Sequence, residues 1–463
     1  MSKPVQVVWF EHNLRTNDHQ GLVMAQESSL PIIGVYILEE VALKKTKHGF
    51  QKVGPYRLQF IDEALNDLKA SLSVYNIPLF VFIGSAVIAF KTIQKTFNIQ
   101  TVYYEKAYGD EERNRHKKVI DALSSIDFTS FNTKSLYHED DLLFKIEHLA
   151  STFTAFRKTI EKSGNIRKPL SLHDYVQDDL PHIQDDLMHF KTLYTFHKPI
   201  LKGGEKEALK RLNYYLFESK KVSTYKETRN GMDDFDDSSK LSAYLAQGCL
   251  SPRTVYQHLK AYEKLHGANE STYWLYFELL WRDYLHFLHA RYQNKFFNKQ
   301  GLYQRDYQPT MNQTFLDAWV KGKTGYPLVD ANMREIHQTG YMSNRGRQNV
   351  ASFFCHYLKL DWRIGAEYFE SLLIDYDVSS NYGNWLYQAG LGVDPRGTRI
   401  FNVIEQGKRY DPTTAYLIKW LPELEALPIK ERYHGKPSNR DSQLTLFSND
   451  IDYPEPIVKV PKL

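Results

Sequence analysis

The sequence contains little cysteine: Cys249 and Cys355 are the only two among 463 residues. Two thiols far apart in the chain cannot build a disulfide scaffold, and they are too few for a four-cysteine iron–sulfur or zinc site. We therefore predict no bound metal. A chain with so few thiols fits best in a reducing cytoplasm.

Long apolar segments are also absent. No run of about 18 apolar residues occurs, so no membrane span is expected. The N-terminus passes from Pro4 directly into an apolar run, without the basic region or cleavage site of a secretory signal. No internal repeat is present. We expect a monomer that is neither secreted nor inserted in a membrane.

Charge is a weak guide, because a formal net charge of +4 over this length does not demand nucleic acid. Aromatic residues are more informative, with 32 Tyr, 26 Phe and 7 Trp. So many rings indicate either a large aromatic core or a protein that stacks rings or moves electrons.

The first third of the chain alternates short apolar runs with amphipathic stretches. Buried strands are predicted at residues 5–10, 31–38, 78–83 and 101–104, and helices at residues 55–75, 85–97 and 110–124. Alternating strand–helix units predict an α/β fold with a parallel, doubly wound sheet over residues 1–130. No G-x-G-x-x-G follows the first strand, so a dinucleotide fingerprint is absent there.

The remaining chain divides into three parts. Residues 131–202 are polar and irregular, which predicts a connector that wraps the surface. Residues 203–430 have an almost entirely helical pattern, and Ser251-Pro252 predicts a helix start with Ser as N-cap. Residues 431–463 are polar and contain proline, which predicts a loosely ordered tail. Further helices are predicted at residues 273–292, 312–321, 330–338 and 347–358.

A dense polar set lies within aromatic sequence between residues 344 and 402. Its segments are Asn344-Arg345-Gly346-Arg347-Gln348-Asn349, Asp375-Tyr376-Asp377, Ser379-Ser380-Asn381-Tyr382-Gly383-Asn384-Trp385, Asp394-Pro395-Arg396 and Arg399-Ile400-Phe401-Asn402. One interpretation is a buried ion-pair network between helices, since buried charges need partners whatever their purpose. The other interpretation is a cofactor site.

These segments resemble the photolyase–cryptochrome family, and specifically its DASH branch. The match runs from Val7 to about Leu424 and includes Trp9-Phe10-Glu11-His12-Asn13-Leu14-Arg15 and Thr324-Gly325-Tyr326-Pro327. The resemblance implies an α/β antenna-binding photolyase domain at residues 1–130 and an all-helical FAD-binding and DNA-repair domain at residues 203–430. It also implies one FAD per chain.

The resemblance assigns cofactor residues one by one. Tyr225 and the run Ser238, Ser239, Lys240, Leu241 and Ser242 resemble the segment that binds the FAD phosphates, although a plain helix cap is the alternative. Further FAD contacts are expected from Glu278, Trp281, Arg282, Asn344, Arg347, Asp375, Asp377 and Asn381. Asn381 would face flavin N5, and an Arg347–Asp375 pair would favour a reduced, anionic flavin.

Chemical roles follow from the same resemblance. Glu278 resembles the carboxyl group that hydrogen-bonds a pyrimidine dimer and stabilises charge as an electron arrives. Trp385 and Trp362 resemble the inner two members of an electron-hopping chain that photoreduces FAD, although such tryptophans are often plain core. The outer tryptophan is missing, because Pro309 stands at about its place. Tyr307 is one substitute, and an exit elsewhere is the other.

Gln348 and Tyr387 resemble the DASH branch, whose lesion pocket is more polar than that of enzymes repairing duplex DNA. No histidine lies at 344–348, so (6-4) photolyase chemistry is unsupported. The implied reaction is repair of cyclobutane pyrimidine dimers, preferentially in single-stranded DNA, where unpairing costs nothing. DNA contacts are expected from Arg345, Gln348, Tyr387, Arg399 and Lys408. A blue-light photoreceptor without repair activity is the alternative function.

Two further partners are predicted. Glu111-Glu112-Arg113 resembles the family segment that contacts a 5,10-methenyltetrahydrofolate antenna, although acidic residues also open helices as dipole partners. Gln443-Leu444-Thr445-Leu446-Phe447 resembles the short peptide by which bacterial repair proteins dock on the sliding clamp. A chance match, or a segment packed on its own protein, is the alternative for that pentapeptide.

Overall fold

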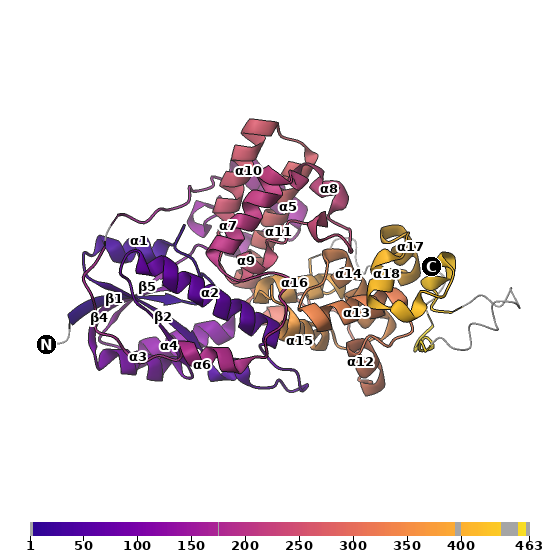
Figure 1. Ribbon diagram of the computed structural model, residues 1–463, viewed down its shortest axis with the longest axis horizontal. Helices are drawn as coiled ribbons and strands as arrows, with labels where there is room; N and C mark the ends of the chain where they lie inside the picture. The colour runs from indigo at the N-terminus through magenta and orange to yellow at the C-terminus, as the bar shows by residue number, and fades with distance from the viewer. Residues whose placement is uncertain (1–2, 175, 394–399, 437–451, 460–463) are drawn as a thin grey trace, which may run out of the picture. The chain divides into compact units, whose positions relative to one another are not determined.

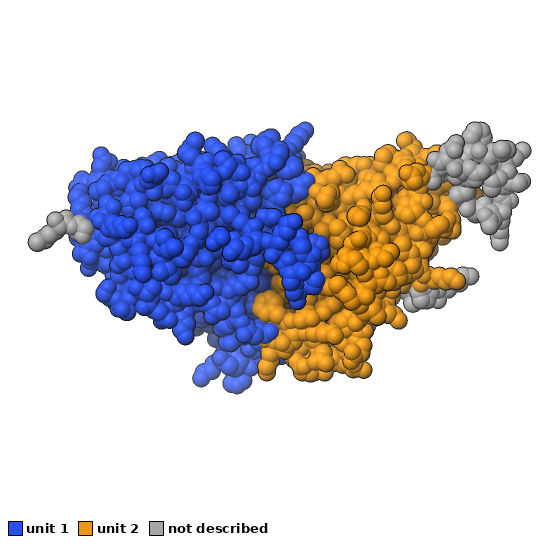
Figure 2. All heavy atoms as spheres, turned by 90° about the horizontal axis from the view of Figure 1, so that it is seen from below, with its two compact units in different colours: residues 1–223, 239–294, 374–380 blue, residues 224–238, 295–373, 381–463 orange. Residues whose placement is uncertain are grey.

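The structure, a computed structural model, describes residues 3–174, 176–393, 400–436 and 452–459. The chain divides into two compact units (Figure 2). Unit 1 comprises residues 1–223, 239–294 and 374–380, and unit 2 comprises residues 224–238, 295–373 and 381–463. Residues 203–223 and 239–294, which the sequence analysis places in the helical domain, belong to unit 1.

Unit 1 contains a five-stranded parallel sheet with the strand order β3-β2-β1-β4-β5. The strands are β1 (Lys3–Phe10), β2 (Ile32–Leu38), β3 (Leu79–Ile83), β4 (Phe97–Glu105) and β5 (Asp127–Phe131). Helices α1 (Gln20–Glu27) and α2 (Pro55–Ser73) cover one face, and α3 (Ala86–Gln94) and α4 (Asp110–Ala122) cover the other (Figure 1). The predicted doubly wound α/β sheet is confirmed.

Continuous apolar sequence in the central strands reflects this two-sided cover. Every residue of β2 is buried, and β1 is buried from Val5 onward. The prediction missed β5, whose sequence Asp-Phe-Thr-Ser-Phe at the sheet edge contains no apolar run. It also missed the short helix α1, which is capped by an imidazole: His19 Nδ1 accepts a hydrogen bond from the Leu22 N–H at 3.1 Å.

The other helices follow in chain order. They are α5 (Phe153–Ser163), α6 (Leu187–Phe190), α7 (Glu205–Asn213), α8 (Tyr225–Thr228), α9 (Ser242–Ala246), α10 (Pro252–His266), α11 (Glu270–Tyr292), α12 (Gln313–Val320), α13 (Pro327–Thr339), α14 (Asn344–Ser352), α15 (Trp362–Leu372), α16 (Val378–Gln388), α17 (Val403–Tyr410), α18 (Ala415–Trp420) and α19 (Ile429–Arg432). Short 3-10 turns are η1 (Glu40–Leu43), η2 (Glu139–Asp141), η3 (Ile146–His148), η4 (Lys191–Leu193), η6 (Lys221–Thr224), η7 (Phe235–Asp237), η8 (Gln293–Phe297) and η10 (Pro422–Leu424), and π-turns are η5 (Tyr214–Glu218) and η9 (Phe353–Tyr357). The predicted N-cap of α10 is confirmed, since Ser251 Oγ accepts a hydrogen bond from the Arg253 N–H at 3.1 Å.

The predicted connector at residues 131–202 is more regular than expected, because it contains α5. Phe156 of α5 is fully buried, and its ring centroid lies 5.2 Å from that of Tyr284 in α11. The ring centroid of Phe153, one turn earlier, lies 4.8 Å from that of Trp281. Aromatic residues at helical spacing therefore hold this polar stretch against α11.

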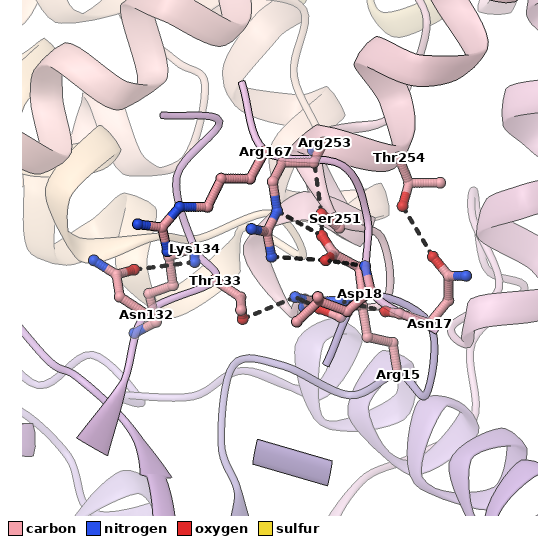
Figure 3. Close-up of polar contacts among 12 residues, drawn as sticks. Arg15, Asn17, Asp18, Asn132, Thr133, Lys134, Arg167, Ser251, Arg253 and Thr254 are labelled. Atoms are coloured by element: carbon pink, nitrogen blue, oxygen red, sulfur yellow. Dashed lines mark hydrogen bonds and ion pairs between the residues drawn. The ribbon is translucent and has the colours of Figure 1, made fainter. Parts of the chain in front are cut away.

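A buried polar cluster joins the loop after β1 to the start of α10 (Figure 3). The Asp18 side chain has no exposed surface, and its carboxylate accepts hydrogen bonds from Arg253 at 2.6 and 2.9 Å and from the Ser251 hydroxyl. Arg15 donates to the Gly248 carbonyl and to the Thr133 hydroxyl, both at 3.0 Å. Buried charges are tolerated only with such partners, so the cluster specifies how α10 meets the sheet in unit 1.

Part of the predicted loose tail is packed, and that prediction is wrong for residues 452–459. The Ile457 N–H donates to the Thr324 carbonyl at 3.0 Å, and the Tyr453 hydroxyl donates to the buried Asp330 carboxylate at 2.5 Å. Gly325 permits this close approach, since a Cβ there would lie 2.5 Å from the backbone of Glu455. The clamp-like peptide at 443–447 lies outside the described residues.

Candidate cofactor site

The segment predicted to bind phosphates has a backbone shape that suits anions. Lys240 has a φ of +56°, and Leu241 follows with a φ of −84° and a ψ of −10°. Successive left- and right-handed residues direct neighbouring N–H groups to one side, forming a nest that fits phosphate oxygens. Ser239, Lys240 and Leu241 are buried, and Ser242 begins α9. A lysine whose backbone adopts the left-handed conformation is unusual, and such residues are typical of binding sites.

Helix α11 positions the next predicted residues, Glu278, Trp281 and Arg282. Glu278 lies one turn after Trp274 and one turn before Trp281, so the three half-buried side chains share a helix face. The Arg282 guanidinium donates to the carbonyl of Lys134 and, at 3.2 Å, to that of Leu245. Arg282 therefore connects α11 to the loop after β5 and to α9, and uses part of its donor capacity there.

Asp377, just before α16, is held as an ionised carboxylate. It accepts hydrogen bonds from the Ser380 N–H at 2.7 Å and from His286 Nε2 at 3.0 Å. Burial by itself would raise the pKa of Asp377, but His286 and Arg282 outweigh burial and hold this pKa well below its ordinary value. Burial lowers the pKa of His286, and the neighbouring Asp377 carboxylate opposes this shift.

The two residues predicted to contact an antenna have different surroundings. Glu111 is exposed and pairs with Lys52. Glu112 lines a small pocket together with Lys134 and Asp377, at the carboxyl ends of β1 and β4 where the strand order reverses. Ligands of open α/β sheets bind at this switch point. The pocket volume of about 30 Å³ is far below the roughly 300 Å³ of small cofactor sites, so a ligand there would have to displace side chains.

In unit 2, α14 carries the polar sequence that starts at Asn344. Ser343 caps the helix, since its Oγ accepts a hydrogen bond from the Gly346 N–H at 3.1 Å. The half-buried Arg347 donates through Nε to the Met342 carbonyl at 2.8 Å, which fixes its guanidinium beside the helix start. Helix α14 continues into the π-turn η9, a deviation common near functional sites.

Asn381 and the two predicted redox tryptophans also belong to unit 2. Asn381 is buried, and its Nδ2 donates to the Ala366 carbonyl at 2.9 Å, which leaves Oδ1 as an acceptor. Such an oxygen fits the N5–H of a reduced flavin. Trp385 packs closely against α15, since a Cβ at Gly365 would lie 2.2 Å from its ring. Trp362 begins the same helix, one turn before Gly365, and is fully buried.

The predicted site residues are thus assigned unit by unit. Unit 1 contains Glu111, Glu112, Ser239, Lys240, Leu241, Ser242, Glu278, Trp281, Arg282, Asp375 and Asp377. Unit 2 contains Tyr225, Ser238, Asn344, Arg345, Arg347, Gln348, Trp362, Asn381, Trp385, Tyr387 and Lys408. Arg399 lies outside the described residues. The phosphate nest and the Asn381 amide both fit FAD chemically.

Sequence reasoning missed several polar residues of α11. Asp283 is fully buried and accepts hydrogen bonds from the N–H groups of Leu136 and Tyr137, both at 2.9 Å. Burial raises its pKa to about 7. His286 and His289 are also buried and bind Asp377 and Ser379. The available signal was a carboxylate and two imidazoles inside an aromatic, apolar helix, where polar groups need partners.

None of the described helices combines the length and apolar character that a membrane crossing requires. The sequence matches the family model "DNA photolyase" over residues 6–173 and the model "FAD binding domain of DNA photolyase" over residues 274–462. The chain is 42% identical to the cryptochrome DASH of Synechocystis sp. over 98% of this chain and 95% of that protein.

Solved structures agree with this relationship. The crystal structure of a Synechocystis sp. cryptochrome superposes with a TM-score of 0.93 at 40% identity, covering 99% of this chain and 97% of that one. An archaeal photolyase from Sulfolobus tokodaii, solved with two FAD molecules, gives a TM-score of 0.79 at 25% identity, with coverages of 98% and 96%. The parallel sheet, the FAD-binding domain and the full-length similarity together show that the chain belongs to the cryptochrome–photolyase family, among the DASH cryptochromes.

Proposed function

We propose that this protein uses blue light to repair cyclobutane pyrimidine dimers, preferentially in single-stranded DNA. Bound FAD in its reduced state would supply the electron that splits the dimer and would take that electron back, so no net oxidation occurs. The alternative function is a blue-light photoreceptor, because the relatives are named cryptochromes.

The observation that carries the repair proposal is the face of α11 that bears Glu278. Its carboxylate lies between Trp274 and Trp281, each one helical turn away, and all three are half-buried. Indole rings offer flat surfaces for an extruded pyrimidine dimer, and a carboxyl group can hydrogen-bond a base edge. We assign Glu278 the role of orienting the dimer and stabilising the charge that develops on it.

Residues on the chain also account for cofactor binding in this proposal. The nest at Ser239, Lys240 and Leu241 would hold the FAD phosphates, and Asn381 would accept a hydrogen bond from flavin N5. Ionised Asp377 keeps the start of α16 in place through the Ser380 N–H. Arg347 would act near the flavin ring, where a positive charge favours the anionic reduced form.

Preference for single-stranded DNA is inferred from Gln348 and Tyr387. Both side chains are half-buried and polar. A polar pocket binds a flipped dimer weakly, and in single strands the base need not be unpaired.

Light-driven splitting of a dimer in single-stranded and in duplex DNA tests this function. The protein is first reduced chemically, so the assay does not depend on photoreduction. We expect repair of single strands and little repair of duplex. Failure to repair either substrate, with FAD present and reduced, would favour the photoreceptor instead.

Arg345 is proposed to contact DNA phosphate. In the structure its guanidinium donates to Asn230 at 2.8 Å and lies 4.5 Å over the Tyr410 ring, so it is held in a defined position. Replacing Arg345 by Ala should lower the slope of log affinity against log salt by about 0.7 on a single-stranded dimer, the loss of one phosphate contact. An unchanged slope contradicts the contact. Lys419→Ala, which alters another cation of unit 2, is the control and should keep the slope.

An antenna is proposed at Glu112, with 5,10-methenyltetrahydrofolate as the ligand. Glu112→Gln should abolish the near-ultraviolet band of folate-saturated protein while FAD content stays constant. Glu40→Gln is the control, because the exposed Glu40 carboxylate pairs with Lys44 outside the antenna segment, and this variant should leave the band intact. Absence of the band from saturated wild-type protein excludes folate. Chromatography of released chromophores then distinguishes a second flavin, since the Sulfolobus relative holds two FAD molecules.

We also propose cytoplasmic location, a monomeric state and, through Gln443 to Phe447, binding to the replication sliding clamp. The cytoplasmic assignment rests on two buried, unbridged thiols, Cys249 and Cys355. Clamp pull-down with protein lacking residues 443–447 tests the last proposal, and undiminished binding would exclude the motif. Sedimentation tests the monomer.

A further inference from the structure

The route by which electrons reach Trp362 from outside lacks the family's outer tryptophan. Trp362 is fully buried, and its indole N–H donates to the Lys299 carbonyl at 3.1 Å. Trp385 is 2% exposed. A reductant in solution therefore cannot directly reduce either indole ring after its oxidation. Pro309, which stands at about the position of the missing outer tryptophan, has no oxidisable ring.

The segment that contains Pro309 runs alongside the start of α15. Thr310 forms a parallel bridge with Leu360, and its N–H donates to the Lys359 carbonyl at 2.8 Å. Within this segment the Tyr307 hydroxyl donates to the Leu360 carbonyl at 2.8 Å. The same hydroxyl oxygen accepts a hydrogen bond from the backbone N–H of Trp362 at 3.2 Å. The Tyr307 phenol is thus joined to the backbone of Trp362 through one hydrogen bond.

The other aromatic residues next to Trp362 and Trp385 are less suited to pass electrons between these rings and the solvent. Trp319 lies 6.3 Å from Trp385 between ring centroids, but Trp319 is fully buried and its next ring, Tyr368, is 4% exposed. Tyr382 lies 6.1 Å from Trp362, within α16 and packed on Phe297. Tyr307 and Tyr382 are both half-buried, but the chain neighbours of Tyr382 are buried. Tyr307 lies in an irregular segment whose immediate neighbours Asp306 and Gln308 are exposed.

We propose that Tyr307 is the outer electron donor of this chain. The inference rests on the proposed flavin photochemistry. Trp385 loses one electron to the light-excited oxidised flavin. Trp362 then reduces the oxidised Trp385, and Tyr307 reduces the oxidised Trp362. Tyr307 then loses its phenolic proton to water and becomes a neutral radical. A thiol in solution returns one hydrogen atom to Tyr307, and is itself oxidised to a thiyl radical.

A tyrosine at this place imposes a signature that a tryptophan lacks. Burial raises the pKa of the Tyr307 hydroxyl above its ordinary value, so the side chain is protonated before it reacts. Its hydrogen-bond acceptor is the Leu360 carbonyl, which is not a base at neutral pH. Oxidation of Tyr307 must therefore release a proton to solvent, and the yield of stable photoreduction becomes sensitive to replacing water by deuterium oxide.

Three variants of the FAD-loaded protein test this proposal under blue light with a thiol donor: Tyr307→Phe, Tyr307→Trp and Tyr382→Phe. The readouts are the tyrosyl radical seen by electron paramagnetic resonance and the solvent isotope effect on photoreduction. We expect Tyr307→Phe to lose the tyrosyl signal and several-fold of the photoreduction yield. Tyr307→Trp should restore the yield without the isotope effect. Tyr382→Phe should resemble wild type.

A tyrosyl signal that persists in Tyr307→Phe and disappears in Tyr382→Phe would overturn the assignment, as would unchanged photoreduction in Tyr307→Phe. Thermal denaturation checks that the Phe variant keeps its fold, and recovery in Tyr307→Trp shows function independently of folding. Repair by chemically reduced protein does not use Tyr307. Normal repair in Tyr307→Phe therefore separates failure of this inference from failure of the proposed function.

Discussion

Replacing Asp18 by asparagine is expected to lower the free energy of unfolding by about 3 to 5 kcal/mol, the cost of removing one partner from a buried ion pair. Arg253 is 4% exposed and would keep its charge without a carboxylate. Asparagine suits the Asp18 backbone, whose φ of +54° lies in the left-handed region, so the change removes charge rather than adding strain. Denaturant titration followed by far-ultraviolet circular dichroism measures the effect.

Two controls identify the cause. Asp141→Asn breaks the Arg167–Asp141 pair, whose side chains are 36% and 22% exposed, and should cost less than about 1 kcal/mol. The double variant Asp18→Asn with Arg253→Met removes both charges and should recover much of the lost stability. Equal losses for Asp18→Asn and Asp141→Asn would show that burial does not govern the strength of the Asp18–Arg253 interaction.

Replacing Glu278 by alanine is expected to lower the rate of dimer repair by a factor on the order of 10², the usual cost of losing one group that stabilises developing charge. The change should leave FAD content and photoreduction unaltered, because the assigned role concerns the dimer and not the flavin redox state. Single-turnover repair of a single-stranded dimer by chemically reduced protein measures the chemical step.

Variants on the same helix make the Glu278 result specific. Glu270→Ala changes an exposed glutamate in the first turn of α11 and should repair at the wild-type rate. Glu278→Gln keeps a hydrogen-bonding side chain and should fall between wild type and Glu278→Ala. Repair at the wild-type rate in Glu278→Ala would remove the residue from the reaction.

The residues proposed for the site could be named from the sequence because short segments carry them. Asn344, Arg347, Asp377 and Asn381 stand in motifs that can be read without knowing which residues surround them. Their partners could not be read in this way. His286, which binds Asp377, lies in α11, far away in sequence, and nothing local marks it as that partner.

The first four strands of the sheet were determined by the sequence alone, because local periodicity and buried apolar runs specify strands such as β2 without reference to distant residues. The edge strand β5 has no apolar run and was decided by pairing with β4. Ser251-Pro252 likewise specified the start of α10, since capping is a local interaction. Tertiary structure alone decided which charges pair, as in Asp18 with Arg253, because such partners lie far apart in the chain. It also decided that residues 452–459 pack on Gly325 and that Tyr307 contacts Trp362, since polar and proline-bearing segments acquire order only from the surfaces they meet.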